Sequence, residues 1–277
     1  YAARAGIDAA VYVPADVTES KLRAIRRAGA EPIRIEGSRE DVTGACVAAL
    51  GDGGRGGETA GGADGGSDGS AWYASHAWNP AFFEGTATVA YEIAAQRGWE
   101  APDAVVYPTG GGVGLVGMHK AAREAKKLGW TDELIPMYAA QAAGCAPVVR
   151  AYESGADRHE PLADDEVDTA CNGIAIPDPG ASHLILEAIR ESDGGAVATT
   201  DREILDAAID VARTEGLEVG ATCAAAVSGA FALAESGEFG PDDTVVLLNT
   251  GAGNKDVDAL RAHLGEREAE ADEDDGA

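Results

Sequence analysis

A run of glycines holds the residues whose types and spacing point most directly to chemistry. It reads Pro108-Thr109-Gly110-Gly111-Gly112-Val113-Gly114 and lies between an expected strand, 104–107, and an expected helix that ends near residue 128. Glycines let the backbone approach an anion closely, and the start of the following helix presents free N–H groups and a positive dipole end. The segment therefore predicts a phosphate-binding loop, with a glycine turn kept only for tight packing as the alternative.

The same run overlaps a dinucleotide-binding pattern. Gly112, Gly114 and Gly117 match G-x-G-x-x-G literally. In that fold the next strand ends in an acid that holds a ribose, whereas the strand expected at 135–140 is followed by Gln141. The neutral residue argues against NAD, and the lack of a Gly-Lys-Ser or Gly-Lys-Thr ending argues against a nucleotide P-loop.

Two further segments combine turn residues with side chains that could line a pocket. Thr250 follows an expected strand, 244–249, and ligands of open α/β sheets bind outside the carboxyl ends of strands. Its hydroxyl could meet a ring nitrogen or satisfy its own turn. Asn79 and Phe82, with His76 just before them, could form a pocket wall or an Asn-Pro turn with a hydrophobic staple.

The charge balance excludes several classes of partner. The 277 residues contain 48 acids and 21 bases, which gives a net charge of −27. Such a surface repels nucleic acid and anionic membranes, so neither is an expected partner. The acids are spread along the whole chain, which favours a solvated surface suited to high salt over a patch for one basic partner.

Cysteine and histidine positions give no sign of a metal site. Cys46, Cys145, Cys171 and Cys223 lie far apart without C-x-x-C spacing and are interpreted as free thiols in a reducing cytoplasm. The five histidines show no metal-ligand spacing, and no G-x-S-x-G elbow suggests a serine hydrolase. No apolar run reaches the ~20 residues needed to cross a bilayer, and no signal peptide is recognisable.

The order of expected elements predicts parallel sheets. Strands at 9–13 and 32–35 alternate with helices at 16–28 and 40–50, which is typical of a parallel sheet. Residues 51–70 contain ten glycines and three aspartates and are expected to form a disordered insertion. Further helices are expected at 83–97, 182–191, 200–216 and 222–235, and the seven acids of 266–275 predict a disordered tail.

Taken together, these segments resemble threonine synthase and its relatives, pyridoxal-phosphate enzymes of the tryptophan-synthase-β fold (fold type II). The similarity runs from Tyr1 to about Leu264, and it is carried by several motifs in the same order. The motifs are Val11-Tyr-Val-Pro-Ala15, Asn79-Pro80, Glu84-Gly85, Ala90-Tyr-Glu-Ile-Ala94, Val106-Tyr-Pro-Thr-Gly-Gly-Gly112, Gln141-Ala-Ala-Gly-Cys-Ala-Pro147 and Leu248-Asn-Thr-Gly-Ala-Gly253.

The resemblance implies an α/β fold with two open, twisted, mostly parallel sheets flanked by helices. Residues 1–50 would be part of a small domain and 71–264 a large cofactor-binding domain, with the insertion at 51–70 and an acidic tail at 265–277. The family also implies a homodimer and a small amino-acid substrate. The implied reaction is that of a carbon–oxygen lyase that converts phosphohomoserine into threonine.

The resemblance also assigns roles to individual residues. The cofactor phosphate would be bound by backbone N–H groups of Gly110, Gly111, Gly112 and Val113. Thr250 would take the pyridine nitrogen of pyridoxal 5′-phosphate. The segment that starts at Tyr1 looks like the end of a helix already under way. In the family, the catalytic lysine that forms the Schiff base lies before this helix, so the resemblance implies a lysine upstream of Tyr1.

Two departures concern the substrate pocket. Phe82 stands where phosphohomoserine-using relatives often carry an arginine, and His76 stands where they carry an asparagine. The change to Phe removes a bidentate anion clamp. A related dehydratase or ammonia-lyase acting on a non-phosphorylated amino acid is therefore an alternative. A NAD-binding oxidoreductase and a catalytically inactive binding relative are alternatives of other classes.

Overall fold

The computed structural model describes residues 1–50, 71–75, 79–251, 253 and 256–275. The chain divides into two compact units, Tyr1–Ser75 and His76–Ala277. The insertion expected at 51–70 and the candidate pocket residue His76 lie outside the described residues. Within the described ranges, every helix is too short or too polar to span a bilayer.

The first unit is a small parallel β-α-β-α arrangement. Its two strands pair in parallel, with Ala10 opposite Glu31 and Pro14 opposite Ile35. This confirms the parallel pairing expected from the element order. The elements are α1 (Ala2–Ala5), β1 (Ala10–Pro14), α2 (Glu19–Arg27), β2 (Glu31–Ile35) and α3 (Arg39–Ala49).

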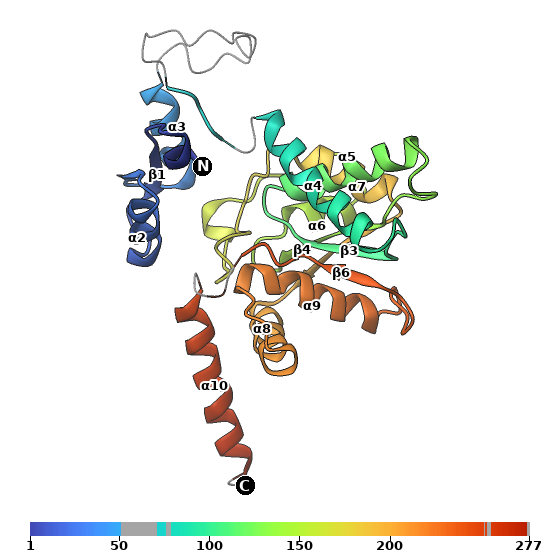
Figure 1. Cartoon of the computed structure of the whole chain (residues 1–277). Coiled ribbons are helices and arrows are strands. Elements are labelled where there is room, and N and C mark those ends of the chain that lie inside the picture. Colours follow the sequence, from blue (N-terminus) through green and yellow to red (C-terminus); the bar gives the residue numbers. More distant parts are fainter. Residues whose placement is uncertain (51–70, 76–78, 252, 254–255, 276–277) are drawn as a thin grey trace. The chain divides into compact units, whose positions relative to one another are not determined.

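The second unit is built on a four-stranded parallel sheet with the order β5-β4-β3-β6. The strands are β3 (Ala104–Pro108), β4 (Met137–Ala142), β5 (Gly195–Thr199) and β6 (Val245–Leu247). The helices are α4 (Pro80–Gln96), α5 (Val113–Lys127), α6 (Pro147–Glu153), α7 (Ser182–Glu191), α8 (Asp201–Glu215), α9 (Ala221–Glu235) and α10 (Val257–Asp275), with a 3-10 turn at 164–166. Figure 1 shows α4, α5, α6 and α7 on one side of this sheet and α8 and α9 on the other.

The sheet is buried on both faces, as parallel sheets require. Val105 and Val106 in β3 are fully buried and face α5 and α9 respectively through two separate clusters of apolar side chains. Gly229 brings α9 close to the sheet, because a Cβ at this residue would lie 2.9 Å from Cγ1 of Val197. The α/β class and the parallel sheets expected from the sequence are thereby confirmed.

The end of the chain differs from the expectation. Residues 266–275 were expected to be disordered, but α10 continues to Asp275. Four glutamates and two alanines, which are strong helix formers, outnumber the three aspartates of this stretch, a preference that the charge count alone does not reveal. Near its middle, α10 is anchored on α8, where Asp206 accepts from Nε2 of His263 at 2.8 Å and pairs with Arg267 at 3.0 Å.

A capping box fixes the start of α8, close to where the expected helix at 200–216 begins. The Thr200 hydroxyl accepts from the backbone N–H of Glu203, and the Glu203 carboxylate accepts from the backbone N–H of Thr200 at 2.7 Å. Side-chain and backbone hydrogen bonds from Thr200 lower the pKa of Glu203. We expect Thr200→Ala to lower the free energy of unfolding by about 1 kcal/mol at neutral pH, measured by urea titration.

The cost of Thr200→Ala should depend on pH in a defined direction. Because the pKa of Glu203 is lower in the folded state, its contribution is present above its unfolded pKa and is lost as the pH falls through the folded value. The difference from the parent chain should therefore shrink in acid. Thr214→Ala, which removes a hydroxyl bonded to the Asp210 carbonyl on the same helix, is the control. A cost that is the same in acid and at neutral pH would contradict the capping-box explanation.

Candidate functional site

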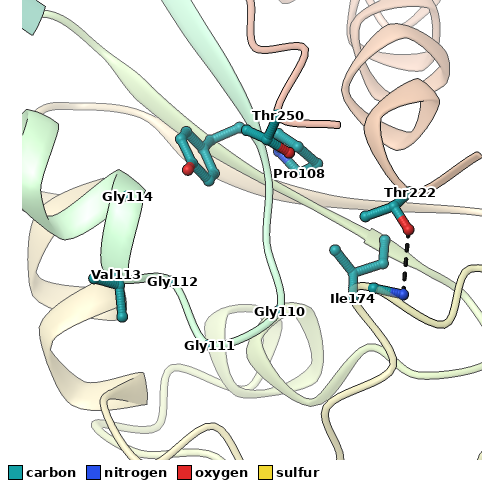
Figure 2. A pocket seen from close by; sticks show the side chains of 11 residues that line it. Pro108, Gly110, Gly111, Gly112, Val113, Gly114, Ile174, Thr222 and Thr250 are labelled. Atoms are coloured by element: carbon teal, nitrogen blue, oxygen red, sulfur yellow. Dashed lines mark hydrogen bonds between the residues drawn. The ribbon is translucent and has the colours of Figure 1, made fainter. Parts of the chain in front are cut away.

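A pocket of about 180 Å³ opens at the carboxyl end of β3, within the second unit. Figure 2 shows the glycine loop, Ile174, Thr222 and Thr250 around this opening. Its position is the one where open α/β sheets bind ligands. The lining residues are Tyr107, Pro108, Gly110, Gly111, Gly112, Val113, Gly114, Gly173, Ile174, Thr222 and Thr250.

The glycine loop presents unpaired donors to this pocket. Gly112 is the N-cap of α5 with φ 73°, and no side chain caps the helix. Among the described residues, no acceptor takes the backbone N–H of any residue in Gly110–Val113. These amides and the positive end of a 15-residue helix converge on one space. Such an arrangement is suited to binding a phosphate group.

The base of the loop is rigidly held. Thr109 is fully buried, its N–H donates to the Ala140 carbonyl at 2.7 Å, and its hydroxyl donates to the Tyr107 carbonyl. Gln141 is also fully buried and donates from Nε2 to the Thr109 carbonyl at 3.0 Å. Its Oε1 accepts from the first turns of α6, at the N–H of Val148. The side-chain amide of Gln141, near the end of β4, thus holds the glycine loop to the start of α6.

The glycines serve packing as well as access to an anion. A Cβ on Gly112 would lie 2.2 Å from Cδ1 of Ile185, and one on Gly110 would lie 2.9 Å from Cγ1 of Ile176. Packing therefore requires glycine at these two positions. It does not account for the run of amides without acceptors in a loop that lines the pocket.

Thr250 lies in the lining of the same pocket, as the sequence predicts. Its Oγ1 is 3.3 Å from Sγ of Cys223, the third residue of α9. The loop and Thr250 come together because β3 and β6 are neighbours in the sheet and run parallel. The pocket therefore offers an anion site at one strand end and a hydroxyl at the next.

The residues expected to form a pocket wall are placed differently. Asn79 is the N-cap of α4, and its side chain accepts from the N–H of Ala81 at 2.9 Å, with Pro80 in the first helical position. Phe82 lies in the first turn of α4 with 39% of its surface exposed. Neither Asn79 nor Phe82 lines the pocket, and the structure gives Asn79 the role of an Asn-Pro turn cap.

Sequence reasoning missed several residues of the site. Thr222, in the first turn of α9, accepts from the N–H of Gly173 at 3.2 Å, the bond drawn in Figure 2. Tyr107 also lines the pocket, and its hydroxyl lies against the place where a Cβ on Gly114 would stand. Burial raises the pKa of Tyr107, and the neighbouring Cys223 raises it further, so the phenol stays protonated near neutral pH.

Among the residues that the structure describes, no lysine, arginine or histidine lines the pocket. Lys120 lies two turns along α5 and bonds to Glu84 at 3.0 Å and Glu124 at 2.6 Å. Lys126 and Lys127 lie in the last turn of α5, Lys21 belongs to the first unit, and Lys255 falls outside the described residues. The described residues also contain no group of acids, histidines and cysteines that could hold a metal ion.

Comparison with known proteins decides the family. Residues 1–251 match the family model described as pyridoxal-phosphate dependent enzyme. The chain belongs to this family. Threonine synthase of Methanosarcina acetivorans is 36% identical over 252 residues, covering 91% of this chain and 58% of that protein. Threonine synthase of Methanocaldococcus jannaschii is 36% identical over 187 residues, covering 68% and 46%. The chain thus spans less than two thirds of these relatives.

Solved structures share the fold of this pyridoxal-phosphate family member. The processed form of threonine deaminase isoform 2 from Solanum lycopersicum superposes with a TM-score of 0.71 at 19% identity, covering 95% of this chain and 64% of that one. A fungal L-serine ammonia-lyase from Rhizomucor miehei gives 0.67 at 21% identity, covering 95% and 75%. These similarities confirm fold type II.

The pocket fits the cofactor that defines the family. Its donors are backbone amides at a helix start, which suit a phosphate, and its other polar groups are neutral hydroxyls, which suit a pyridine nitrogen. The NAD-binding alternative is wrong, because the chain belongs to the pyridoxal-phosphate family. The structure agrees, since the residue near the end of β4 where an acid would have to reach a ribose is the buried Gln141.

Proposed function

We propose that the protein to which this chain belongs is a pyridoxal-phosphate-dependent carbon–oxygen lyase of the threonine-synthase type, acting on phosphohomoserine. The observation that carries the proposal is the pocket where the free amides of the glycine loop and Thr250 line one space. The similarity to threonine synthases over 91% of the chain supports the reaction class.

The residues of the pocket have distinct proposed roles. The amides of Gly110–Val113 bind the cofactor phosphate, and the Thr250 hydroxyl meets the ring nitrogen. The cofactor supplies a ring that withdraws electrons from the substrate's α carbon. A neutral hydroxyl at the ring nitrogen leaves this withdrawal weaker than a carboxylate would, which suits elimination and replacement at the β or γ carbon. Gln141 keeps the loop in place by holding the Thr109 carbonyl.

Assembly and location are part of the same proposal. A homodimer is proposed from the family resemblance, and a location in the cytoplasm from the four cysteines, which form no disulfide. The 48 acids against 21 bases support an acidic surface adapted to high salt. The proposed division into a small domain, residues 1–50, and a large domain, 71–264, is supported by the separate compact units.

Binding of a cofactor analogue tests the phosphate site without requiring a catalytic lysine. Pyridoxamine 5′-phosphate and pyridoxamine differ only in the phosphate, and neither carries an aldehyde. Calorimetric titration of the 277-residue chain should show at least about tenfold tighter binding of the phosphorylated analogue, as expected for one or more charge-assisted hydrogen bonds. Equal affinities for the two compounds would contradict the assignment of the glycine loop.

A second candidate function is favoured by the side chains that the structure describes around the pocket. A dehydratase or ammonia-lyase would need no group for a substrate phosphate, and no described cationic side chain lines the pocket. By the family resemblance, Phe82 and His76 stand where an arginine and an asparagine would hold the substrate phosphate, so the substrate site should discriminate weakly between charged and neutral leaving groups.

Substrate preference separates the two candidates. We expect kcat/KM for phosphohomoserine to exceed that for serine or threonine by no more than about tenfold in the whole protein, because the bidentate clamp is missing. Steady-state kinetics with the three substrates gives this ratio. A preference of several hundredfold would show that another cation holds the substrate phosphate. Lys120 and Arg150 are then the first to replace, although the structure pairs them with Glu124 and Glu166.

A further inference from the structure

A buried thiol lies directly behind Thr250. Cys223 has only 2% of its surface exposed and does not line the pocket. Its Sγ is 3.3 Å from Oγ1 of Thr250 and 3.4 Å from the carbonyl oxygen of Gly251. The sulfur therefore contacts Thr250, the pocket-lining residue whose hydroxyl the resemblance assigns to the ring nitrogen of the cofactor.

The backbone already holds this turn without the sulfur. The N–H of Gly220, the N-cap of α9, donates to the same Gly251 carbonyl at 3.3 Å. The other members of this core cluster that come from α9 are alanines: Ala221, Ala224 and Ala225. What the cysteine adds is a polar contact to the Thr250 hydroxyl.

The protons at this contact allow the sulfur to pair with the Thr250 hydroxyl in either direction. A threonine hydroxyl has one proton and two acceptor lone pairs, and a thiol is a weak donor and a weak acceptor. When the thiol donates to Oγ1, the hydroxyl proton is left for another acceptor, and the remaining direction is the pocket. When the ring nitrogen carries a proton, the hydroxyl can donate to the sulfur and accept from the ring. One thiol thus supports either polarity of the Thr250 contact.

We propose that Cys223 is a positioning residue that orients the Thr250 hydroxyl toward the ring nitrogen of the cofactor. This inference rests on the proposed function, because it requires a nitrogen-containing ring in the pocket. Cys223 acts only through Thr250, since its sulfur is behind the pocket wall. Tyr107 is the other protic side chain close to this sulfur, and its protonated phenol places no negative charge beside the ring.

A double-mutant cycle with two ligands tests this role in the 277-residue chain. The ligands are pyridoxamine 5′-phosphate and benzyl phosphate, which has an aromatic ring and a phosphate but no ring nitrogen. Cys223→Ala should weaken binding of pyridoxamine 5′-phosphate by about three- to tenfold, the range for one hydrogen bond. Binding of benzyl phosphate should stay within about twofold.

The other variants show whether the effect passes through Thr250. Thr250→Ala should weaken pyridoxamine 5′-phosphate binding at least as much, and the double variant should bind like Thr250→Ala alone, because the two losses are one interaction. Cys223→Ser should restore most of the affinity, since a hydroxyl also donates and accepts. Cys145→Ala removes another fully buried thiol, outside the pocket lining, and is the control for loss of a sulfur atom.

The outcomes separate this inference from the proposed function. Additive losses in the double variant, or equal losses for both ligands, would assign Cys223 a general structural role and overturn the inference. A loss with Thr250→Ala but none with Cys223→Ala would overturn it while leaving the proposed cofactor site intact. No loss with Thr250→Ala would remove the ring-nitrogen contact itself, and the inference with it.

Discussion

Gly111→Asp is expected to weaken binding of pyridoxamine 5′-phosphate by about a hundredfold or more. Gly111 lies in the middle of the loop and in the lining of the pocket, between residues whose amides have no acceptor. Two unit charges 4 Å apart repel by about 4 kcal/mol at the effective dielectric constant of a protein surface. The half-buried position allows the carboxylate to turn partly toward water, so we expect about 3 kcal/mol of this repulsion to oppose binding. Because about 1.4 kcal/mol corresponds to a factor of ten, this is a loss of about a hundredfold in affinity.

The matched control places the same carboxylate elsewhere in the second unit. Gly265 is exposed on α10, and a Cβ there meets no atom within 4 Å, so Gly265→Asp adds the same charge without entering the pocket. Calorimetric titration of both variants, with circular dichroism to compare their folding, gives the result. A folded Gly111→Asp variant that retains the parent affinity would place the phosphate somewhere other than the glycine loop.

The glycine loop of the pocket was predictable because its parts are contiguous in the sequence. An apolar strand, a run of glycines and a helix follow one another within 104–127, and local chemistry fixes the direction in which the amides point. Thr250 was predictable for a related reason. It follows the apolar strand β6, and ligands of parallel sheets bind at the carboxyl ends of the strands.

The residues that complete the pocket come from distant segments without a local signal. Gly173 and Thr222 are 49 positions apart and meet through one hydrogen bond. The contact of Cys223 with Thr250 depends on how α9 packs beside β6, and the small apolar residues of α9 look alike on every face of the helix. Packing of alanine-rich helices is decided by shape, which the pattern of apolar and polar residues does not encode.

Two elements of the second unit escaped prediction for a similar reason. The strand β5, Gly195–Thr199, consists of glycine, alanine, valine and threonine and has no alternation of apolar and polar side chains. The helix α6, Pro147–Glu153, has only seven residues, too few for a periodic pattern. The strand β5 forms because β4 provides its hydrogen-bonding partners. The helix α6 is stabilised at its start because Oε1 of Gln141 accepts from the N–H of Val148.

Thermal stability is expected to depend strongly on salt, because acids outnumber bases 48 to 21. In the part of the chain that the structure describes, several bases are each shared by two acids, so the clusters stay negative. These are Lys120 with Glu84 and Glu124, Arg123 with Glu187 and Glu191, and Arg267 with Asp206 and Asp210. Exposed pairs of this kind contribute little. Repulsion among the remaining acids should therefore decide how stability responds to ionic strength.

We expect the melting temperature to rise by at least about 5 °C between dilute buffer and 1 M KCl, which corresponds to roughly 2 kcal/mol for a domain of this size. The shape of the curve distinguishes screening from salting-out. The Debye length falls from about 30 Å at 0.01 M to about 10 Å at 0.1 M, so screening should produce most of the rise within the first few hundred millimolar. Salting-out strengthens apolar burial steadily at higher concentration. Melting curves recorded by circular dichroism across this range separate the two, and a flat response below 0.3 M would show that repulsion between acids does not limit the stability of this chain.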